Sequence, residues 1–418
     1  MTPEAICFFD FGVIDFAERP EVDYQNGQVA GFVGRSRDMP NAPRTGKSTF
    51  FSAWNTAPLS MPWVPEPIAS SPPSPKPLNE TRILGNTHMI TKMNHVERFR
   101  AVMNFQPVDR LPRWEWAMWW DKTVDRWHAE GLPAELKGVF EICDYFGLDP
   151  YKQYWFSTTD ATIEAEQHHV EGIVSNMDDY LAHRPNLFPD HGDAILGMKP
   201  WLELQNSGEA VIWITLEGFF WFPRTLMGFT KLMLAFYDQP ELLHQMNQDL
   251  LDFNLAILER IERIGRPTFM TIAEDMSYNN GPMISRGLMD EFLAPYYKKL
   301  LARAKEMEML TIVDTDGDVT LLVPWLLDNG IKGVLPLERQ AGVDGMSLRA
   351  RFLNLRMVGH YNKMVMPHGE DAMRAEFERL LPLMKSGGFI PSVDHQTPPG
   401  VSLENYRIYL RLLHEYIR

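Results

Sequence analysis

Short apolar segments alternate with longer helical patterns from residue 111 to the C-terminal end of the sequence. The segments are rich in β-branched and aliphatic residues, and they recur roughly every 30–45 residues, a spacing typical of parallel βα units. Eight such units in about 320 residues predict a (β/α)8 TIM-type barrel with insertions. An open, doubly wound α/β sheet is the alternative fold.

The predicted strands can be read directly from the sequence. They are Leu111–Trp116, a strand after Tyr145–Asp149, Ala210–Leu216, Pro267–Ile272, Thr311–Val313, Gly333–Leu337, Arg356–Gly359 and Gly388–Val393. The main predicted helices are Met118–His128, Glu241–Gly265, Met289–Met309, Leu321–Asp328, Glu370–Lys385 and Leu403–Tyr416. Thr162–Arg184 alternates apolar and polar residues, which predicts a β-hairpin excursion outside the core.

The stretch Thr311–Asp318 reads T-I-V-D-T-D-G-D and carries the densest cluster of acidic residues. Its apolar start predicts a buried strand, so its carboxylates are expected where that strand meets the next helix. The spacing resembles a calcium loop, but Val319 and Trp325 stand where that loop needs glycine and glutamate. A helix N-cap followed by a solvated turn is the plain structural alternative.

Acidic and histidine residues also follow other predicted strands. The set comprises Asp149, Glu274, Asp275, Asp314, Asp316, Glu338, His360, Asp394 and His395. In a barrel the carboxyl ends of the strands converge on one face, where active sites lie. This set therefore predicts an active site, although His360 can equally be a structural loop histidine.

Composition excludes several classes of protein. The 418-residue chain has a net charge of −15, which argues against nucleic acid or an anionic membrane as the main partner. No apolar run approaches the ~20 residues needed to span a bilayer. Cys7 and Cys143 are the only cysteines, so neither a disulfide framework nor a thiolate zinc site is expected. These features predict a cytoplasmic protein.

Residues 1–92 differ in composition from the rest of the chain. Met39–Pro77 is crowded with proline and serine, which cannot form a packed core, so 1–92 is predicted to be a disordered extension. A wrongly assigned upstream start, with the chain beginning near Met89 or Met93, is the alternative. Thr45–Ser48 resembles the end of a phosphate-binding loop, but Asn41 stands where its first glycine belongs. The predicted barrel domain spans 93–418.

Several ordered motifs resemble the uroporphyrinogen decarboxylase (URO-D) superfamily. They are Glu97–Arg110 (E-R-F-R-A-V-M-N-F-Q-P-V-D-R), Pro223–Met227 (P-R-T-L-M), Asn280–Pro295, Gly330–Asp344 and His395–Asn405. The resemblance implies a (β/α)8 barrel. It also implies one of two activities, because the superfamily includes both the porphyrin-pathway decarboxylase and methyltransferases that work with corrinoid proteins.

The decarboxylase branch fits this sequence poorly. Its paired arginines, which hold the substrate carboxylates, fall here on Ala117 and Asp121. The family tyrosine falls on Phe229, and the family serine falls on Asp275. Asp149 and His395 do match, as the family aspartate that binds pyrrole N–H groups and the C-terminal histidine.

The methyltransferase branch implies a different site. Its zinc-binding H-x-C-G and C-terminal cysteine fall here on Asp314-x-Asp316-Gly317 and His395, so the thiolates are gone. Asp314, Asp316 and His395 could instead bind zinc or a similar divalent metal through oxygen and nitrogen. Alternatively, the metal has been lost and the carboxylates serve as acid and base.

We therefore expect an enzyme that carries out corrinoid-linked methyl transfer or demethylation. Its partners would be a small-molecule substrate and a methylcorrinoid carried by a partner protein; the chain could form a homodimer. The expected catalytic residues are Asp149, Glu274, Asp275, Glu338 and His395. Cofactor-free decarboxylation of uroporphyrinogen is the alternative function, and a non-catalytic barrel that binds a tetrapyrrole or corrinoid is the third.

Overall fold

A computed structural model describes residues 22–25, 28–32, 92–159 and 172–418. The first of its two compact units contains a small antiparallel hairpin, formed by β1 (Val22–Gln25) and β2 (Gln28–Phe32). The rest of 1–91 lies outside the described residues, so the expected disorder of 1–92 stays a prediction. All other described elements belong to the second unit, Pro65–Arg418.

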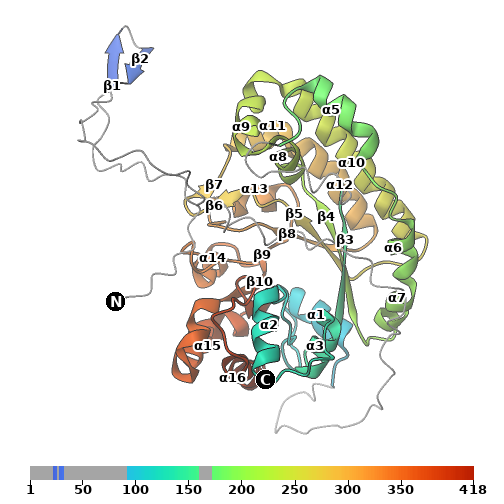
Figure 1. Cartoon of the computed structure of the whole chain (residues 1–418), viewed down its shortest axis with the longest axis vertical. Helices are drawn as coiled ribbons and strands as arrows, with labels where there is room; N and C mark the ends of the chain where they lie inside the picture. The colour runs from blue at the N-terminus through green and yellow to red at the C-terminus, as the bar shows by residue number, and fades with distance from the viewer. Residues whose placement is uncertain (1–21, 26–27, 33–91, 160–171) are drawn as a thin grey trace, which may run out of the picture. The chain divides into compact units, whose positions relative to one another are not determined.

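A curled parallel sheet of seven strands forms the centre of the second unit (Figure 1). The strands, in spatial order, are β11 (Phe389–Val393), β10 (Arg356–Tyr361), β9 (Gly333–Leu335), β8 (Leu310–Asp314), β5 (Phe269–Ala273), β4 (Val211–Glu217) and β3 (Tyr151–Phe156). Every residue of β4, β5 and β11 is buried, as expected for parallel strands covered on both faces. The predicted α/β fold with a parallel sheet is confirmed.

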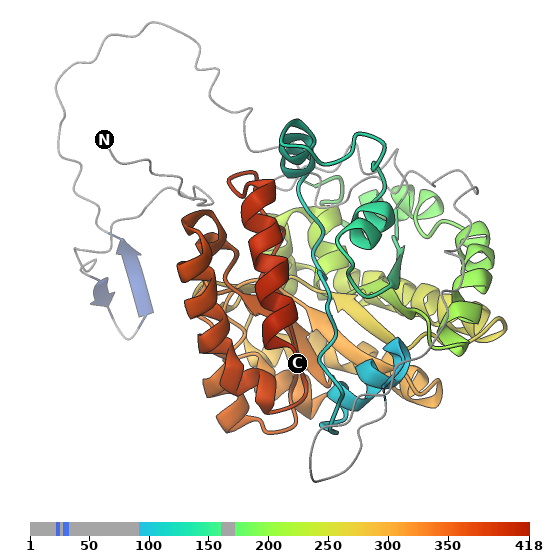
Figure 2. The same cartoon turned by 90° about the horizontal axis from the view of Figure 1, so that it is seen from below.

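Helices pack around the sheet (Figures 1 and 2). They are α1 (His95–Met103), α2 (Asp121–Ala129), α3 (Val139–Tyr145), α5 (Met177–His183), α6 (Gly192–Gly197), α7 (Lys199–Asn206), α8 (Trp221–Met227), α9 (Phe229–Asp238), α10 (Pro240–Glu262), α11 (Arg286–Phe292), α12 (Ala294–Glu306), α13 (Val323–Asp328), α14 (Gly345–Arg351), α15 (Glu370–Lys385) and α16 (Leu403–Tyr416). Short pieces complete the fold: the 3-10 helices η1 (Arg184–Asn186) and η2 (Lys363–His368), and the hairpin of β6 (Ser277–Tyr278) and β7 (Gly281–Pro282). Among the described residues, no helix is long and apolar enough to cross a membrane.

The predicted first strand, Leu111–Trp116, is an extended segment without a strand ladder. It nevertheless lies between the two edges of the sheet. On one side the Trp116 N–H donates to Ser392 Oγ (3.1 Å), next to β11. On the other side the Asp149 N–H donates to the Arg113 carbonyl (2.9 Å), just before β3. Pro112 has no N–H to donate, which helps to explain why regular pairing is missing.

Two other predictions need correction. The predicted helix Met289–Met309 is divided into α11 and α12, and Pro295 occupies the first turn of α12, where its missing N–H costs nothing. The predicted β-hairpin at Thr162–Arg184 is wrong over its described part, since residues 177–183 form α5. Residues 160–171 of that stretch lie outside the described residues.

An aromatic layer fills the interior near the N-terminal ends of the strands. Trp114 stacks on Phe99 with ring centroids 5.3 Å apart, and Tyr151 stacks on Trp213 at 5.2 Å. Phe269, the first residue of β5, contacts both groups. Large apolar side chains therefore fill the interior at this end of the sheet.

Candidate functional site

The loop after β8 carries the acidic residues that the sequence singled out. Asp314 ends the strand, and Asp316 lies two residues further along the chain. Gly317 has a positive φ of 81°, and a Cβ there would lie 2.8 Å from the backbone of Tyr278. Only glycine fits that close approach without a shift. The turn therefore fixes where the Asp316 carboxylate points.

Strand ends bring other polar groups to this loop. Asp316 Oδ2 lies 3.7 Å from Nε2 of His395, which follows β11. Glu338, in the loop after β9, accepts a hydrogen bond from the Gly317 N–H (3.0 Å). Asp275, just after β5, lies close enough to affect the pKa values of both Asp314 and Asp316. We call Asp275, Asp314, Asp316, Glu338 and His395 the carboxylate–histidine cluster.

The pKa values of three carboxyl groups in the cluster are raised. Burial, reinforced by the charge of Asp316, raises the pKa of Asp314 well above its usual value. Burial and Asp275 raise the pKa of Asp316, while burial and Asp316 raise that of Glu338. The pKa of His395 is lowered, by burial and then by Lys363. With pKa values raised to about 7, Asp316 and Glu338 can take up and release protons beside His395 near pH 7.

Two cations border the cluster, and each already has a carboxylate partner. Arg224 in α8 donates to Asp275 Oδ2 (2.9 Å) and to the Asp275 carbonyl (2.6 Å). Lys363 Nζ lies 3.3 Å from Oδ1 of the buried Asp394. Their charges lower the pKa of Asp316 only in part, and it stays raised. Both residues could have been identified as site candidates from the sequence, since Arg224 belongs to the P-R-T-L-M motif and Lys363 closely follows β10.

Glu274 has a structural role, although it directly follows β5 as predicted. Its buried carboxylate accepts hydrogen bonds from the N–H groups of Phe219 (2.9 Å), Phe220 (2.8 Å) and Trp221 (3.0 Å). The Tyr297 hydroxyl donates to it as well. Burial raises its pKa to about 7. With its oxygens used in this way, Glu274 holds the loop before α8 in place.

Asp149 lies at the opposite end of the sheet from the cluster. It precedes β3 instead of following a strand, so its predicted position is corrected. The Arg110 guanidinium donates two hydrogen bonds, of 2.7 and 2.8 Å, to the Asp149 carboxylate. Despite burial, His95 and Arg110 hold the pKa of Asp149 below its usual range. The buried carboxylate thus anchors the chain before β3.

His360 is also structural. It is fully buried, its Nδ1 contacts the Leu337 carbonyl (2.9 Å), and its Nε2 accepts from the Gly345 N–H (2.9 Å). Burial lowers its pKa to about 4. A neutral imidazole with a proton on Nδ1 satisfies both contacts. His360 lies within β10, not after the strand as predicted, and it links β10 to the loop after β9 and to the start of α14.

The residues predicted to bind a metal are only partly assembled. Asp316 and His395 approach each other, but among the residues that the structure describes no three His, Cys, Asp or Glu side chains are arranged to hold a metal ion. The predicted set of Asp314, Asp316 and His395 does not fit a divalent ion in this arrangement. Metal binding stays a prediction, and acid–base chemistry by the cluster does not depend on it.

Glu115 is a buried carboxylate that was not among the predicted site residues. Glu115, in the segment before α2, accepts hydrogen bonds from Ser392 Oγ (2.8 Å), the Val393 N–H (3.3 Å) and the Tyr406 hydroxyl (3.0 Å). Burial raises its pKa to about 7. In the sequence, Glu115 could have been noticed as an acidic residue inside an apolar strand pattern.

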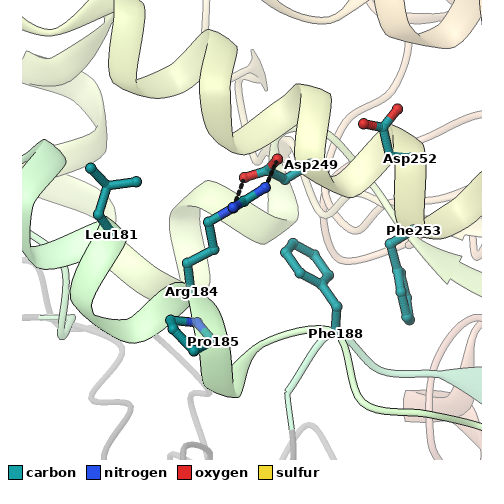
Figure 3. Close-up of a pocket in the computed structure, with 7 residues that line it drawn as sticks. All are labelled: Leu181, Arg184, Pro185, Phe188, Asp249, Asp252 and Phe253. Carbon is teal, nitrogen blue, oxygen red and sulfur yellow. Dashed lines mark hydrogen bonds and ion pairs between the residues drawn. The ribbon is translucent and has the colours of Figure 1, made fainter.

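A separate surface cavity lies on the outer side of α10 (Figure 3). Its volume is about 360 Å³, and it is lined by Leu181, Arg184, Pro185, Phe188, Asp249, Asp252 and Phe253. Arg184 is paired with Asp249 through two hydrogen bonds of 2.6 and 2.8 Å. None of the lining residues belongs to the carboxylate–histidine cluster.

Fold and site together define a class of protein: an α/β protein with a cluster of carboxyl groups and a histidine at the carboxyl ends of a curled parallel sheet. Residues 214–416 match the family described as uroporphyrinogen decarboxylase (URO-D). The matched residues include the strands from β5 to β11, whose ends carry the cluster, and the match confirms the resemblance seen in the sequence.

This chain was also compared with solved structures. A methyltransferase from Methanosarcina mazei is 16% identical, with a TM-score of 0.55 over 78% of this chain and 100% of that chain. A candidate vitamin-B12 independent methionine synthase from Listeria monocytogenes is 10% identical, with a TM-score of 0.40 over 74% and 96% of the two chains. No curated protein sequence matches. At 16% identity, the likeness to the Methanosarcina methyltransferase shows the fold alone.

Proposed function

We propose that this protein is a URO-D-superfamily enzyme that transfers a methyl group at the carboxylate–histidine cluster. In this proposal the sheet forms a (β/α)8 barrel whose remaining strand position is occupied by residues 111–119. The contacts of Trp116 with Ser392 on one side and of Arg113 with Asp149 on the other support that closure. A parallel bridge between Trp119 and Thr397 supports it too.

One observation carries the proposal: three carboxyl groups with raised pKa values, Asp314, Asp316 and Glu338, gather beside His395. When a methyl group leaves a substrate oxygen or nitrogen, the bonding electrons stay on that atom, which then needs a proton. Protonated Asp316 or Glu338 can supply it, and neutral His395 can orient the Asp316 carboxyl group. In the reverse direction the same carboxylates accept the proton.

The methyl acceptor in the proposed demethylation is a corrinoid carried by a partner protein, which supplies the nucleophile for the methyl group. Apolar side chains exposed on the loops that surround the cluster support the approach of such a partner. They include Tyr278 (41% exposed), Leu321 (65%) and Met364 (40%), which follow β5, β8 and β10. A small methylated molecule would occupy the space between them and the cluster.

Decarboxylation of uroporphyrinogen is less well supported. The substrate of that reaction carries many carboxylates, which need cationic partners to hold them. Ala117 is buried, and Asp121 begins α2, where the decarboxylase has its paired arginines. The nearest cations, Arg224 and Lys363, are already paired with Asp275 and Asp394.

The test is a methyl-transfer assay with reduced free cobalamin as acceptor and a panel of methylated oxygen and nitrogen compounds as donors. Formation of methylcobalamin is followed by its absorbance. We expect Asp316→Asn and His395→Gln to reduce kcat by about a hundredfold or more. The matched control, Asp318→Asn, changes an acid in the same loop whose side chain accepts from the Thr320 N–H, and it should retain activity. Unchanged kcat in both site variants would contradict the proposed site.

A further inference from the structure

A cluster of basic side chains lies at the N-terminal end of the sheet, opposite the carboxylate–histidine cluster. It is built from three parts of the chain that the fold brings together: the start of α1, the segment 110–113 and the C-terminal end of α16. The Leu111 N–H donates to the Ile417 carbonyl (2.8 Å), which ties the second part to the third. In Figures 1 and 2 the C-terminus accordingly lies near α1.

The side-chain charges in this cluster do not balance. Two arginines have their own carboxylates: Arg98 donates to Asp109 (2.8 and 2.7 Å), and Arg110 donates to Asp149 (2.8 and 2.7 Å). Arg113 and Arg418 lie near Arg110, and neither forms an ion pair with a described carboxylate. The C-terminal carbonyl groups of α16 offset part of this positive charge.

The burial of Arg113 makes the excess positive charge energetically unfavourable. Its guanidinium is half-buried against the turn at Gly147, where a Cβ would lie 3.8 Å from the Arg113 Nη1 atom. Its Nε is buried and has no hydrogen-bond partner among the described residues. Burial lowers the pKa of Arg113, and the neighbouring Arg110 and Arg418 lower it further against the opposing effect of Asp149. A buried donor on a charged group without a partner is strongly unfavourable.

His414 faces the same space from α16. Its Nδ1 is buried without a partner among the described residues, while its Nε2 contacts Arg418. Burial lowers the pKa of His414, as do the charges of Arg113, Arg418 and Arg110. Two buried donor positions from different parts of the chain, Arg113 Nε and His414 Nδ1, thus lack an acceptor within one positively charged region.

We propose that this basic cluster binds a small oxyanion of the phosphate class, at a site separate from the active site. A phosphate would accept hydrogen bonds from Arg113 and His414 and offset the charge of Arg418. Guanidinium groups bind pairs of phosphate oxygens with two parallel hydrogen bonds. The exposed side of Arg418 and the half-buried His95 leave the cluster open to solvent on one side.

The experiment measures binding of inorganic phosphate to the full chain by equilibrium dialysis, with thermal unfolding in phosphate and in chloride at equal ionic strength. We expect saturable binding to the wild-type protein and an affinity lower by about tenfold or more in Arg113→Gln and His414→Gln. The matched control is Arg263→Gln, which removes an exposed arginine paired only with Glu259. Its affinity should equal that of the wild type.

The thermal stability of Arg113→Gln distinguishes a ligand site from a purely structural role of Arg113. An anion site predicts that Arg113→Gln keeps or raises Tm in chloride, because an unpaired charge is removed, and that it loses the specific gain in phosphate. A structural role predicts an equal loss of Tm in both salts. Absence of saturable phosphate binding to the wild type, or unchanged binding in Arg113→Gln, would overturn the proposal. So would acetate binding as tightly as phosphate.

Discussion

Asp316 and His395 come from the ends of β8 and β11, with β9 and β10 between them in the sheet, and yet Asp316 Oδ2 lies 3.7 Å from His395 Nε2. In a flat sheet, strands three places apart would be separated by roughly 14 Å. The curl of the sheet brings the two side chains together. The contact therefore depends on the tertiary fold, and it supplies the proposed acid–base pair.

The buried Glu115 predicts a pH-dependent contribution to stability. Its pKa rises from an ordinary 4.5 to about 7 in the folded state. The stabilisation is fully present below the unfolded value and is lost as the pH rises through about 7. Between pH 5 and pH 8 we expect the wild-type free energy of unfolding to fall by about 2–3 kcal/mol more than that of Glu115→Gln.

Urea unfolding at several pH values measures this difference. Glu404→Gln, which removes an exposed acid of the same helix α16 that carries Tyr406, is the control and should follow the wild type. Parallel pH profiles for the wild type and Glu115→Gln would show that Glu115 is ionised throughout this range.

Glu274 is predicted to stabilise the loop before α8. Glu274→Ala leaves the N–H groups of Phe219, Phe220 and Trp221 without their acceptor and should cost roughly 3 kcal/mol. Tyr297→Phe removes only one donor and should cost about 1 kcal/mol. Denaturant unfolding gives both values, and a cost below that of Tyr297→Phe for the Glu274 variant would contradict the assigned role.

Turnover of uroporphyrinogen is predicted to be negligible. Ala117 and Asp121 replace the two arginines that hold substrate carboxylates in the decarboxylase branch. Separation of the porphyrin products by chromatography detects coproporphyrinogen directly. Robust product at ordinary enzyme concentrations would favour the decarboxylase function over methyl transfer.

Metal binding by Asp314, Asp316 and His395 can be measured directly. If the prediction is correct, purified protein supplemented with zinc should hold about one ion per chain. Asp316→Ala and His395→Ala should each lower that occupancy. Protein that stays metal-free after supplementation, or full occupancy in both variants, would leave acid–base chemistry by the carboxylates as the account of this site.

The sequence alone was enough to predict the parallel α/β fold and the place of the acidic loop. Strand residues such as Thr311–Val313 and Gly388–Val393 are apolar because both faces of the sheet are covered, so their pattern is local and readable. Asp314 and Asp316 lie at the end of β8 as expected. The family motifs lie in the same order along the chain, which is also a property of the sequence.

Only the tertiary structure decided what each polar residue does. Glu274 and Asp275 are neighbours after β5, but the first is locked by backbone N–H groups while the second faces Asp314 and Asp316. Asp149 lies at the far end of the sheet because β3 begins after it. The partners of these residues come from distant parts of the chain. No local pattern encodes which donor will reach a carboxylate once the sheet curls.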